Sequence, residues 1–223
     1  MDANERLDDI ISNGLHVDIF EAEQSIAIDW LIGCHAKEVN ESTFGEFFGS
    51  LQIICGRYSI LAVNRLFETP SNRYSIRSIP AAIDLMKSER QALHLPRKLA
   101  VIDKLIEFGC NALRLEGLED PQITELIATE FEKRLPQITL SDSLSRALGA
   151  LKTARDKSIA HHESIKIADL PKATYADMDK LLKYAKEFVS TIGIAYLSLD
   201  AKAAARSMKR LMSKAGIVPS SRQ

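Results

Sequence analysis

Residues 141–162 read SDSLSRALGALKTARDKSIAHH. The stretch opens with a helix start, because Ser141 or Ser143 is a residue type that caps the free N–H groups of a helix N-terminus. Three leucines then recur at the three- and four-residue spacing of an amphipathic helix, namely Leu144, Leu148 and Leu151. The stretch therefore predicts a capped helix that continues to about His161 and carries charged and imidazole groups near its C-terminal end.

The rest of the chain repeats this helical pattern. Only 10 glycines and 7 prolines interrupt the 223 residues, and the alternation typical of strands is scarce. The spacing predicts further long helices over about 18–39, 43–68, 96–115, 121–135 and 174–199, with a short helix starting at Pro80. A separate short amphipathic piece with Leu7, Ile10 and Ile11 is expected before the first of them. Thr43 with Glu46, and Thr174 with Asp177, fit the reciprocal capping box, while Asp120 followed by Pro121 fits a cap and a first-turn proline.

These helices predict an all-α fold, an up-and-down helical bundle with short additional helices. No repeat of solenoid period and no low-complexity linker divides the chain, so we expect one domain over residues 1–223. Its core is expected over about 18–199. A basic C-terminal helix and tail would follow over 200–223, serving either as a solvated helix end or as a guide for RNA.

Composition narrows the class of protein. With 46% hydrophobic and 26% charged residues the chain resembles an average globular protein, and its net charge of -1 gives no global case for binding nucleic acid. The polar, acidic opening is unlike a secretory leader, and no apolar run reaches the ~18 residues of a membrane span. We expect a cytoplasmic protein that does not engage a membrane, with Cys34, Cys55 and Cys110 as reduced core thiols.

The chemistry-bearing residues of the opening stretch are Arg155, Asp156, His161 and His162. Arg–His spacing of this kind arises by chance, so its place at the end of a capped helix matters more than the spacing itself. RNA cleavage without a metal needs a base for the 2′-hydroxyl, an acid for the leaving oxygen and positive charge on the phosphate. Histidine suits both proton transfers near neutral pH, and arginine offers a planar fork for phosphate oxygens.

The segment resembles the HEPN superfamily (higher eukaryotes and prokaryotes nucleotide-binding domain), whose marker is an Arg, a polar residue and a His after a gap of four to six residues. Arg155, Asp156 and His161 fit that marker, including the small residue Ala160 before the histidine. Other stretches are similar to the abortive-infection branch of the superfamily: residues 61–68 (LAVNRLFE), 75–80 (SIRSIP) and 174–179 (TYADMD).

The resemblance implies a HEPN-type helical bundle with Arg155, Asp156, His161 and His162 as catalytic residues. It implies a metal-independent endoribonuclease that needs no cofactor, works as a homodimer on an RNA substrate, and acts in phage defence or as a toxin. An antitoxin or another defence protein would then be a partner. The alternative is a non-catalytic helical dimer that serves as a protein- or nucleotide-binding module.

Helix geometry separates the two histidines. On an ideal helix His162 returns to within ~20° of Arg155, whereas His161 lies about 120° away and ~9 Å along the axis. One Arg–His set is therefore a poor active site, and a dimer would bring a second set to the same cleft. The line of small residues Ala147, Ala150 and Ala154 is compatible with close approach of another helix.

Plainer roles compete with the catalytic one. Arg155 could pair with a nearby acid, Asp156 could belong to a solvated face, and the two histidines could cap the helix dipole. Trp30, Phe47 and Phe48 are expected in the core, and His35 in the core or on the surface. Four arginines around one loop could contact phosphate, although a solvated or ion-paired role is commoner: Arg57, Arg65, Arg73 and Arg77.

Overall fold

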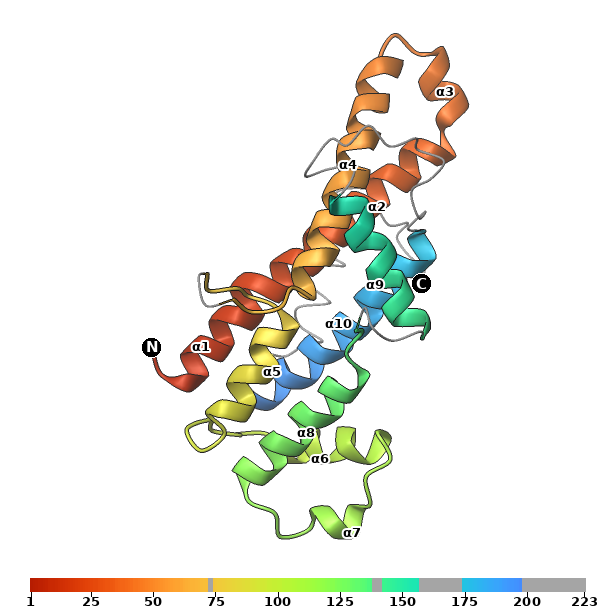
Figure 1. Cartoon of the computed structure of the whole chain (residues 1–223). Helices are drawn as coiled ribbons and strands as arrows, with labels where there is room; N and C mark the ends of the chain where they lie inside the picture. The colour runs from red at the N-terminus through yellow and green to blue at the C-terminus, as the bar shows by residue number, and fades with distance from the viewer. Residues whose placement is uncertain (72–73, 138–141, 157–173, 198–223) are drawn as a thin grey trace, which may run out of the picture.

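The computed structural model describes residues 1–71, 74–137, 142–156 and 174–197. Within these ranges every regular element is a helix, apart from one isolated antiparallel bridge between Ser71 and Tyr74 (Figure 1). The predicted all-α fold is thus confirmed. The predicted division into one domain with a basic tail stays a prediction, because the tail lies outside the described residues.

The N-terminal 34 residues form one continuous helical rod. Helix α1 (Ala3–Ile10) runs through the π-helical turn η1 (Ile11–Leu15) directly into α2 (His16–Cys34). The sequence predicted a separate short piece before a helix at 18–39, and this was wrong because no cap or proline stands between the segments. An ideal Cβ built at Gly14 would lie 2.3 Å from the Cβ of Arg77. Glycine at this position therefore allows the loop before residue 79, which contains Arg77, to pack directly on the rod.

Helix α2 turns back through α3 (Ala36–Glu41) into α4 (Gly45–Leu66), and the two long helices project together as a hairpin (Figure 1). The predicted capping box of Thr43 and Glu46 does not form. Ser42 Oγ instead accepts a hydrogen bond from the Phe44 N–H at 3.2 Å, and Phe44 precedes the first helical residue.

The remaining helices complete the molecule. They are α5 (Ile79–Ser88), α6 (Lys98–Glu107), α7 (Ala112–Leu115), α8 (Asp120–Arg134), α9 (Ser143–Ala154) and α10 (Tyr175–Leu197). The single helix predicted over 96–115 is broken because Gly109 adopts a left-handed conformation, with φ of 92°. The cap before α8 is Glu119 rather than Asp120.

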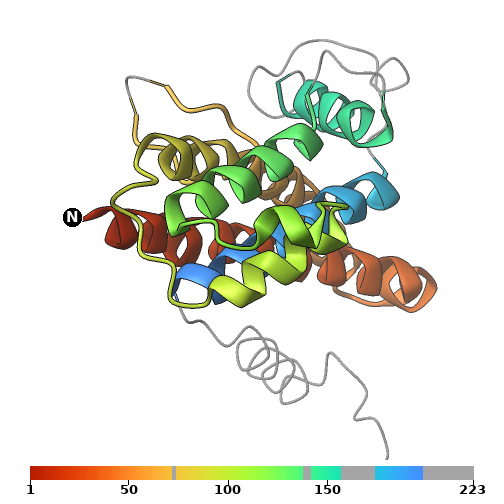
Figure 2. The ribbon, with the colours of Figure 1, turned by 90° about the horizontal axis from the view of Figure 1, so that it is seen from below.

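Helix α10 is the central element, and it packs against α1, α2, α4, α6 and α9 (Figures 1 and 2). Two buried tyrosines tie it to α8: Tyr184 donates to the Phe131 carbonyl and Tyr196 to Thr124 Oγ1, each at 2.7 Å. Burial raises the pKa of both tyrosines, so both remain protonated donors. The capping box predicted for the start of α10 is confirmed, since the Asp177 N–H donates to Thr174 Oγ1 at 3.2 Å.

Some residues expected in the core lie on the surface. Trp30 is 63% exposed and Phe47 is 62% exposed, and Phe48 is half-buried. Of the predicted core thiols only Cys55 is buried, whereas Cys110 is half-buried and Cys34 exposed. The prediction failed for these residues because helical spacing identifies an apolar face without showing which surface covers it.

Candidate functional site

The first two residues of the Arg–His motif, Arg155 and Asp156, directly follow helix α9. Asp142 caps it by accepting hydrogen bonds from the Leu144 and Ser145 N–H groups at 2.9 and 3.0 Å, so neither predicted serine is the cap. Asp142 is preferred because its carboxylate also favours the positive end of the helix dipole. The helix ends at Ala154, and Arg155 and Asp156 continue in a wider π-type turn.

Arg155 lines a cavity of about 600 Å³ beside α9. Leu148, Lys152 and Arg155 follow one another at four- and three-residue spacing, so they share the face of α9 that borders the cavity. The opposite walls come from the end of α4 and the loop after it, from α5, and from the end of α8. A segment far from the motif in sequence therefore completes the site.

The Arg155 side chain is 24% exposed, which is low for an arginine at a helix end. Its Nε donates to Asp156 Oδ1 at 2.7 Å, as the ion-pair alternative predicted. This contact uses one of the five N–H donors of the guanidinium. Since Arg155 also borders the cavity, ion pairing and phosphate contact are compatible roles.

Charge is divided unevenly around this cavity. The cations Lys152 and Arg155 come from α9, whereas the carboxylates Glu68, Asp84 and Glu132 come from the facing walls. Lys87, on α5, forms an ion pair with Glu132. A phosphate entering the cavity would therefore be attracted to the α9 side and repelled by the walls opposite.

His161 and His162 lie outside the described residues, so the structure does not place them relative to Arg155. The angular argument that favoured His162 assumed an ideal α-helix through residue 162. It no longer applies, because the backbone already departs from α geometry at Arg155. The alanines that were compatible with close approach of a partner helix instead pack mainly inside this chain. Ala147 and Ala154 are buried within this chain, and only Ala150 of the three is partly open.

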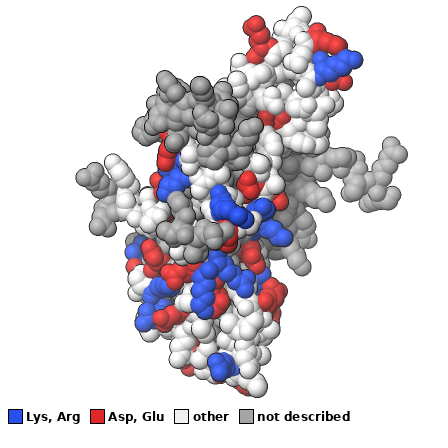
Figure 3. All heavy atoms as spheres, turned by 45° about the vertical axis from the view of Figure 1, so that its right-hand side comes forward, with Lys and Arg blue, Asp and Glu red and all other residues white. Residues whose placement is uncertain are grey.

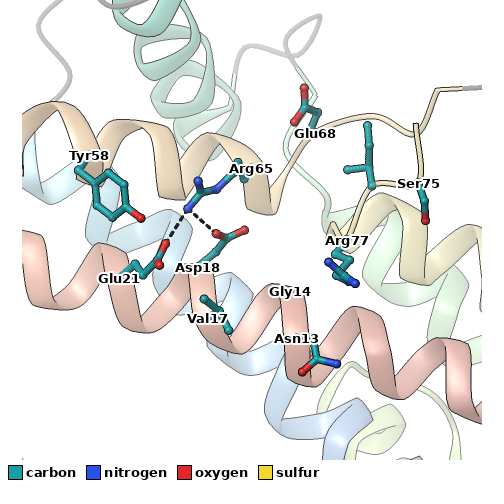
Figure 4. Close-up of a pocket in the computed structure, with 11 residues that line it drawn as sticks. Asn13, Gly14, Val17, Asp18, Glu21, Tyr58, Arg65, Glu68, Ser75 and Arg77 are labelled. Carbon is teal, nitrogen blue, oxygen red and sulfur yellow. Dashed lines mark hydrogen bonds and ion pairs between the residues drawn. The ribbon is translucent and has the colours of Figure 1, made fainter. Parts of the chain in front are cut away.

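A second cavity, of about 330 Å³, lies between the N-terminal rod, α4 and the segment before α5 (Figure 4). Arg65 Nη2 lies 2.7 Å from Asp18 Oδ1 and 2.7 Å from Glu21 Oε2, and its Cζ lies 5.7 Å from the centre of the Tyr58 ring. Burial raises the pKa of the Asp18 carboxyl, and the adjacent Arg65 opposes this rise.

The arginines of the second cavity are already matched to carboxylates. Arg77 forms a two-point contact with Asp9, at 2.7 and 3.1 Å, so it resembles Arg65 in this respect. The commoner of the predicted roles was a solvated or ion-paired one, and Arg65 and Arg77 are ion-paired. Arg57 is exposed, and Arg73 lies outside the described residues. A ligand phosphate would have to displace carboxylates here, so the Arg155 cavity is the better candidate site.

Sequence comparison identifies the family of this chain. The profile of HEPN_AbiU2, described as AbiU2, matches residues 33–210, which include both α9 and the whole Arg–His motif. The chain belongs to the AbiU2 family. AbiU2 proteins are HEPN proteins of the abortive-infection branch, so the resemblance found in the sequence is confirmed. No curated protein and no solved structure matches the chain.

The described part of this AbiU2 protein has no helix that is long and apolar enough to cross a membrane. In the same residues no group of three His, Cys, Asp or Glu side chains is placed to hold a metal ion.

Sequence reasoning missed Lys152, Glu68, Asp84 and Glu132 as residues of the cavity. Lys152 could have been found, since it stands three residues before Arg155 and four after Leu148 on one helix face. The three carboxylates carried no local signal, because only the packing of α4, α5 and α8 brings them opposite α9.

Proposed function

We propose that this AbiU2 protein is a metal-independent endoribonuclease that acts in phage defence or as a toxin. The single observation that carries the proposal is the position of Arg155: the arginine of the family motif lines a cavity of about 600 Å³ beside Lys152. A cavity of this size admits a nucleotide and its phosphate.

The reaction would be an attack of the RNA 2′-hydroxyl on the adjacent phosphorus, with departure of the 5′-oxygen. His161 would accept the hydroxyl proton, and a second histidine would give a proton to the leaving oxygen. Arg155 and Lys152 would stabilise the negative charge that builds on the phosphate oxygens. Asp156 would position the Arg155 guanidinium through the observed contact at Nε.

A homodimer would supply the second histidine, with an interface that includes the helix from about Ser143 to His161. The described outer face of α9, away from the cavity, includes exposed Ser143 and Arg146. A partner chain would meet polar groups there rather than the buried alanines.

The test is incubation of purified protein with total RNA in the presence of a chelator, beside the Arg155→Ala, His161→Ala double variant. We expect fragments with the unaltered chain and none with the variant. Arg114→Ala is the control, because Arg114 is an exposed arginine on α7 that neither lines the cavity nor belongs to α9. Equal cleavage by all three proteins would mean that the activity comes from elsewhere.

The second candidate function is a non-catalytic module that binds a protein or a nucleotide in the same cavity. The carboxylates on the walls facing Arg155 favour it, because they would oppose an extended anionic strand. Intact RNA under all conditions, with saturable binding of a mononucleotide that Arg155→Ala weakens, would support this function.

A further inference from the structure

The hairpin of α2 and α4 buries polar side chains beside apolar ones such as Ile32 and Cys55, which are 8% and 6% exposed. Its interior contains Ser25, Asp29 and Ser59, which are 7%, 8% and 1% exposed. The backbone carbonyl of Asp29 faces Gln52 Nε2 at 3.5 Å across the hairpin. Burial raises the pKa of the Asp29 carboxyl, and a hydrogen bond from Gln52 opposes this rise. Amphipathic helices usually bury an apolar stripe, so three buried polar side chains between these two helices are unusual.

The outer surface of the same hairpin is apolar. We name as the hairpin patch six large side chains: Trp30 at 63% exposure, Leu31 at 47%, Phe44 at 65%, Phe47 at 62%, Ile53 at 59% and Ile54 at 61%. In the view of Figure 3 the hairpin end, at the top, is largely white below a few charged atoms at its tip.

Charge is sparse in the two helical segments that bear five of the six patch residues, although Glu23 and Asp179 lie beside Trp30. In residues 25–34 and 47–56 the only charged residue is Asp29, and it is buried. Soluble surfaces normally carry Lys, Arg, Glu or Asp at such positions. Depletion of charge together with exposed aromatic residues is the composition of the core of a protein interface.

The size of the patch suits an interface between two proteins. A side chain of this kind offers roughly 150–250 Å², so six that are about half to two thirds exposed present on the order of 600 Å². That is at the upper limit for an unpartnered patch on a monomer. It approaches the ~800 Å² per partner of a standard protein interface.

The residues around the tip disfavour a membrane as the occupant. Between residues 35 and 46 one lysine, Lys37, stands with three glutamates, Glu38, Glu41 and Glu46. Helices that lie on membranes are usually rich in Lys and Arg, which attract anionic lipid headgroups. An acidic tip would be repelled from such a surface.

We propose that the hairpin patch binds the hairpin of a second copy of this chain, so that α2 and α4 of both copies form a four-helix bundle. An uncharged patch is self-complementary, because a two-fold axis brings no like charges together. Ile53 and Ile54 are adjacent in α4, so they point about 100° apart and reach both sides of the hairpin. This interface is separate from α9 and does not depend on ribonuclease activity.

The first test compares molar masses by light scattering at micromolar concentrations. Ile53→Asp, Ile54→Asp should halve the mass of the wild-type assembly, because two buried carboxylates would oppose pairing. The control is Leu99→Asp, Leu113→Asp, which alters two residues that are 75% and 79% exposed on α6 and α7. It should leave the mass unchanged. Circular dichroism should show equal helix content in all three proteins.

Trp30 supplies a second measurement, because it is the single tryptophan of the chain and belongs to the patch. On dilution of the wild type its fluorescence should shift to the red as the side chain becomes exposed to water. In the Ile53→Asp, Ile54→Asp variant it should stay at the red position at every concentration.

Several results would overturn the proposal. One is that the wild-type protein is monomeric at high micromolar concentration. Another is that the Ile53→Asp, Ile54→Asp variant has the same molar mass as the wild type. A Trp30 spectrum that is independent of concentration but shifts to the blue on adding phosphatidylcholine or phosphatidylglycerol vesicles would assign the patch to a lipid surface instead.

Discussion

Arg155 stands at the residue where α9 leaves ideal geometry. Its Nε is bound to Asp156 at 2.7 Å and its side chain borders the cavity, so the guanidinium is both fixed and accessible. Such widened turns are often found at functional sites. Asp156 thus holds one side of the guanidinium, while the side chain still borders the cavity.

We expect Arg155→Ala to lower the rate of RNA cleavage by about 10²–10³-fold, the usual loss when one group that stabilises transition-state charge is removed. Arg155→Lys should recover only part of the rate, since an ammonium keeps the charge but not the planar fork. Single-turnover rates measured beside the Arg114→Ala control distinguish the loss of Arg155 from the loss of any one positive charge. Full activity of Arg155→Ala would exclude it from the site.

The motif predicts that His161 is the working histidine, although His162 follows it directly. His161→Ala should abolish cleavage, and His162→Ala should weaken it by roughly tenfold to hundredfold, as expected for a supporting contact. The measurement is the cleavage rate of each single variant at neutral pH. The opposite ranking would assign the proton transfer to His162.

Asp29 gives the hairpin a dependence on pH. Burial raises its folded-state pKa above the unfolded value, so its charged form destabilises the folded protein at pH values above both. Asp29→Asn should raise the free energy of unfolding at pH 7 by about 1 kcal/mol. The gain should disappear as pH falls below the unfolded pKa, where the carboxyl is neutral in both states. Denaturant unfolding at pH 3 and pH 7 measures this, since pH 3 lies below the unfolded pKa of 3.8, and an equal gain at both pH values would argue against a charge effect.

Gly14 tests the contact between the N-terminal rod and the loop before α5. A methyl group there would meet the Arg77 Cβ at 2.3 Å, so Gly14→Ala should lower the free energy of unfolding by about 1–3 kcal/mol. Gly149→Ala is the control, because nothing lies within 4 Å of its Cβ position. That change should stabilise α9 by up to about 1 kcal/mol. Thermal unfolding that ranks the two variants the other way would contradict the close approach.

At the scale of elements, local signals predicted the helices that have local stop and start residues. Pro80 lies in the first turn of α5, Thr174 caps α10, and α8 ends before Pro136, all as the sequence indicated. Each depends on the chemistry of a few neighbouring residues. The Arg155 end of the candidate site was predictable for the same reason.

Other features required tertiary packing. The junction of α1 and α2 has no local mark, because the π turn keeps the backbone bonded without a cap. The acidic walls of the cavity come from three segments distant in sequence, namely the loop after α4, with Glu68, and helices α5 and α8, with Asp84 and Glu132. Trp30 was assigned to the core because its apolar neighbours recur at helical spacing, yet among the described residues its side chain is 63% exposed.

At the scale of the whole molecule, the α9 interface and the hairpin interface can be separated. In the Ile53→Asp, Ile54→Asp background we expect light scattering to show twice the mass of the 223-residue chain, since α9 pairing would remain. Two different interfaces on each wild-type chain would then give an assembly of four. A monomer at high micromolar concentration in that background would remove the argument for a composite Arg–His site.

The exposed hairpin patch also affects how assembly depends on the concentration of the protein. Pairing of two identical surfaces is second order in the protein, so at low abundance a tenfold rise in copy number produces about a hundredfold rise in paired hairpins. Sparse expression would leave the chains apart, and a burst of synthesis would join them. The patch would thus make the amount of paired protein rise more steeply than the amount translated.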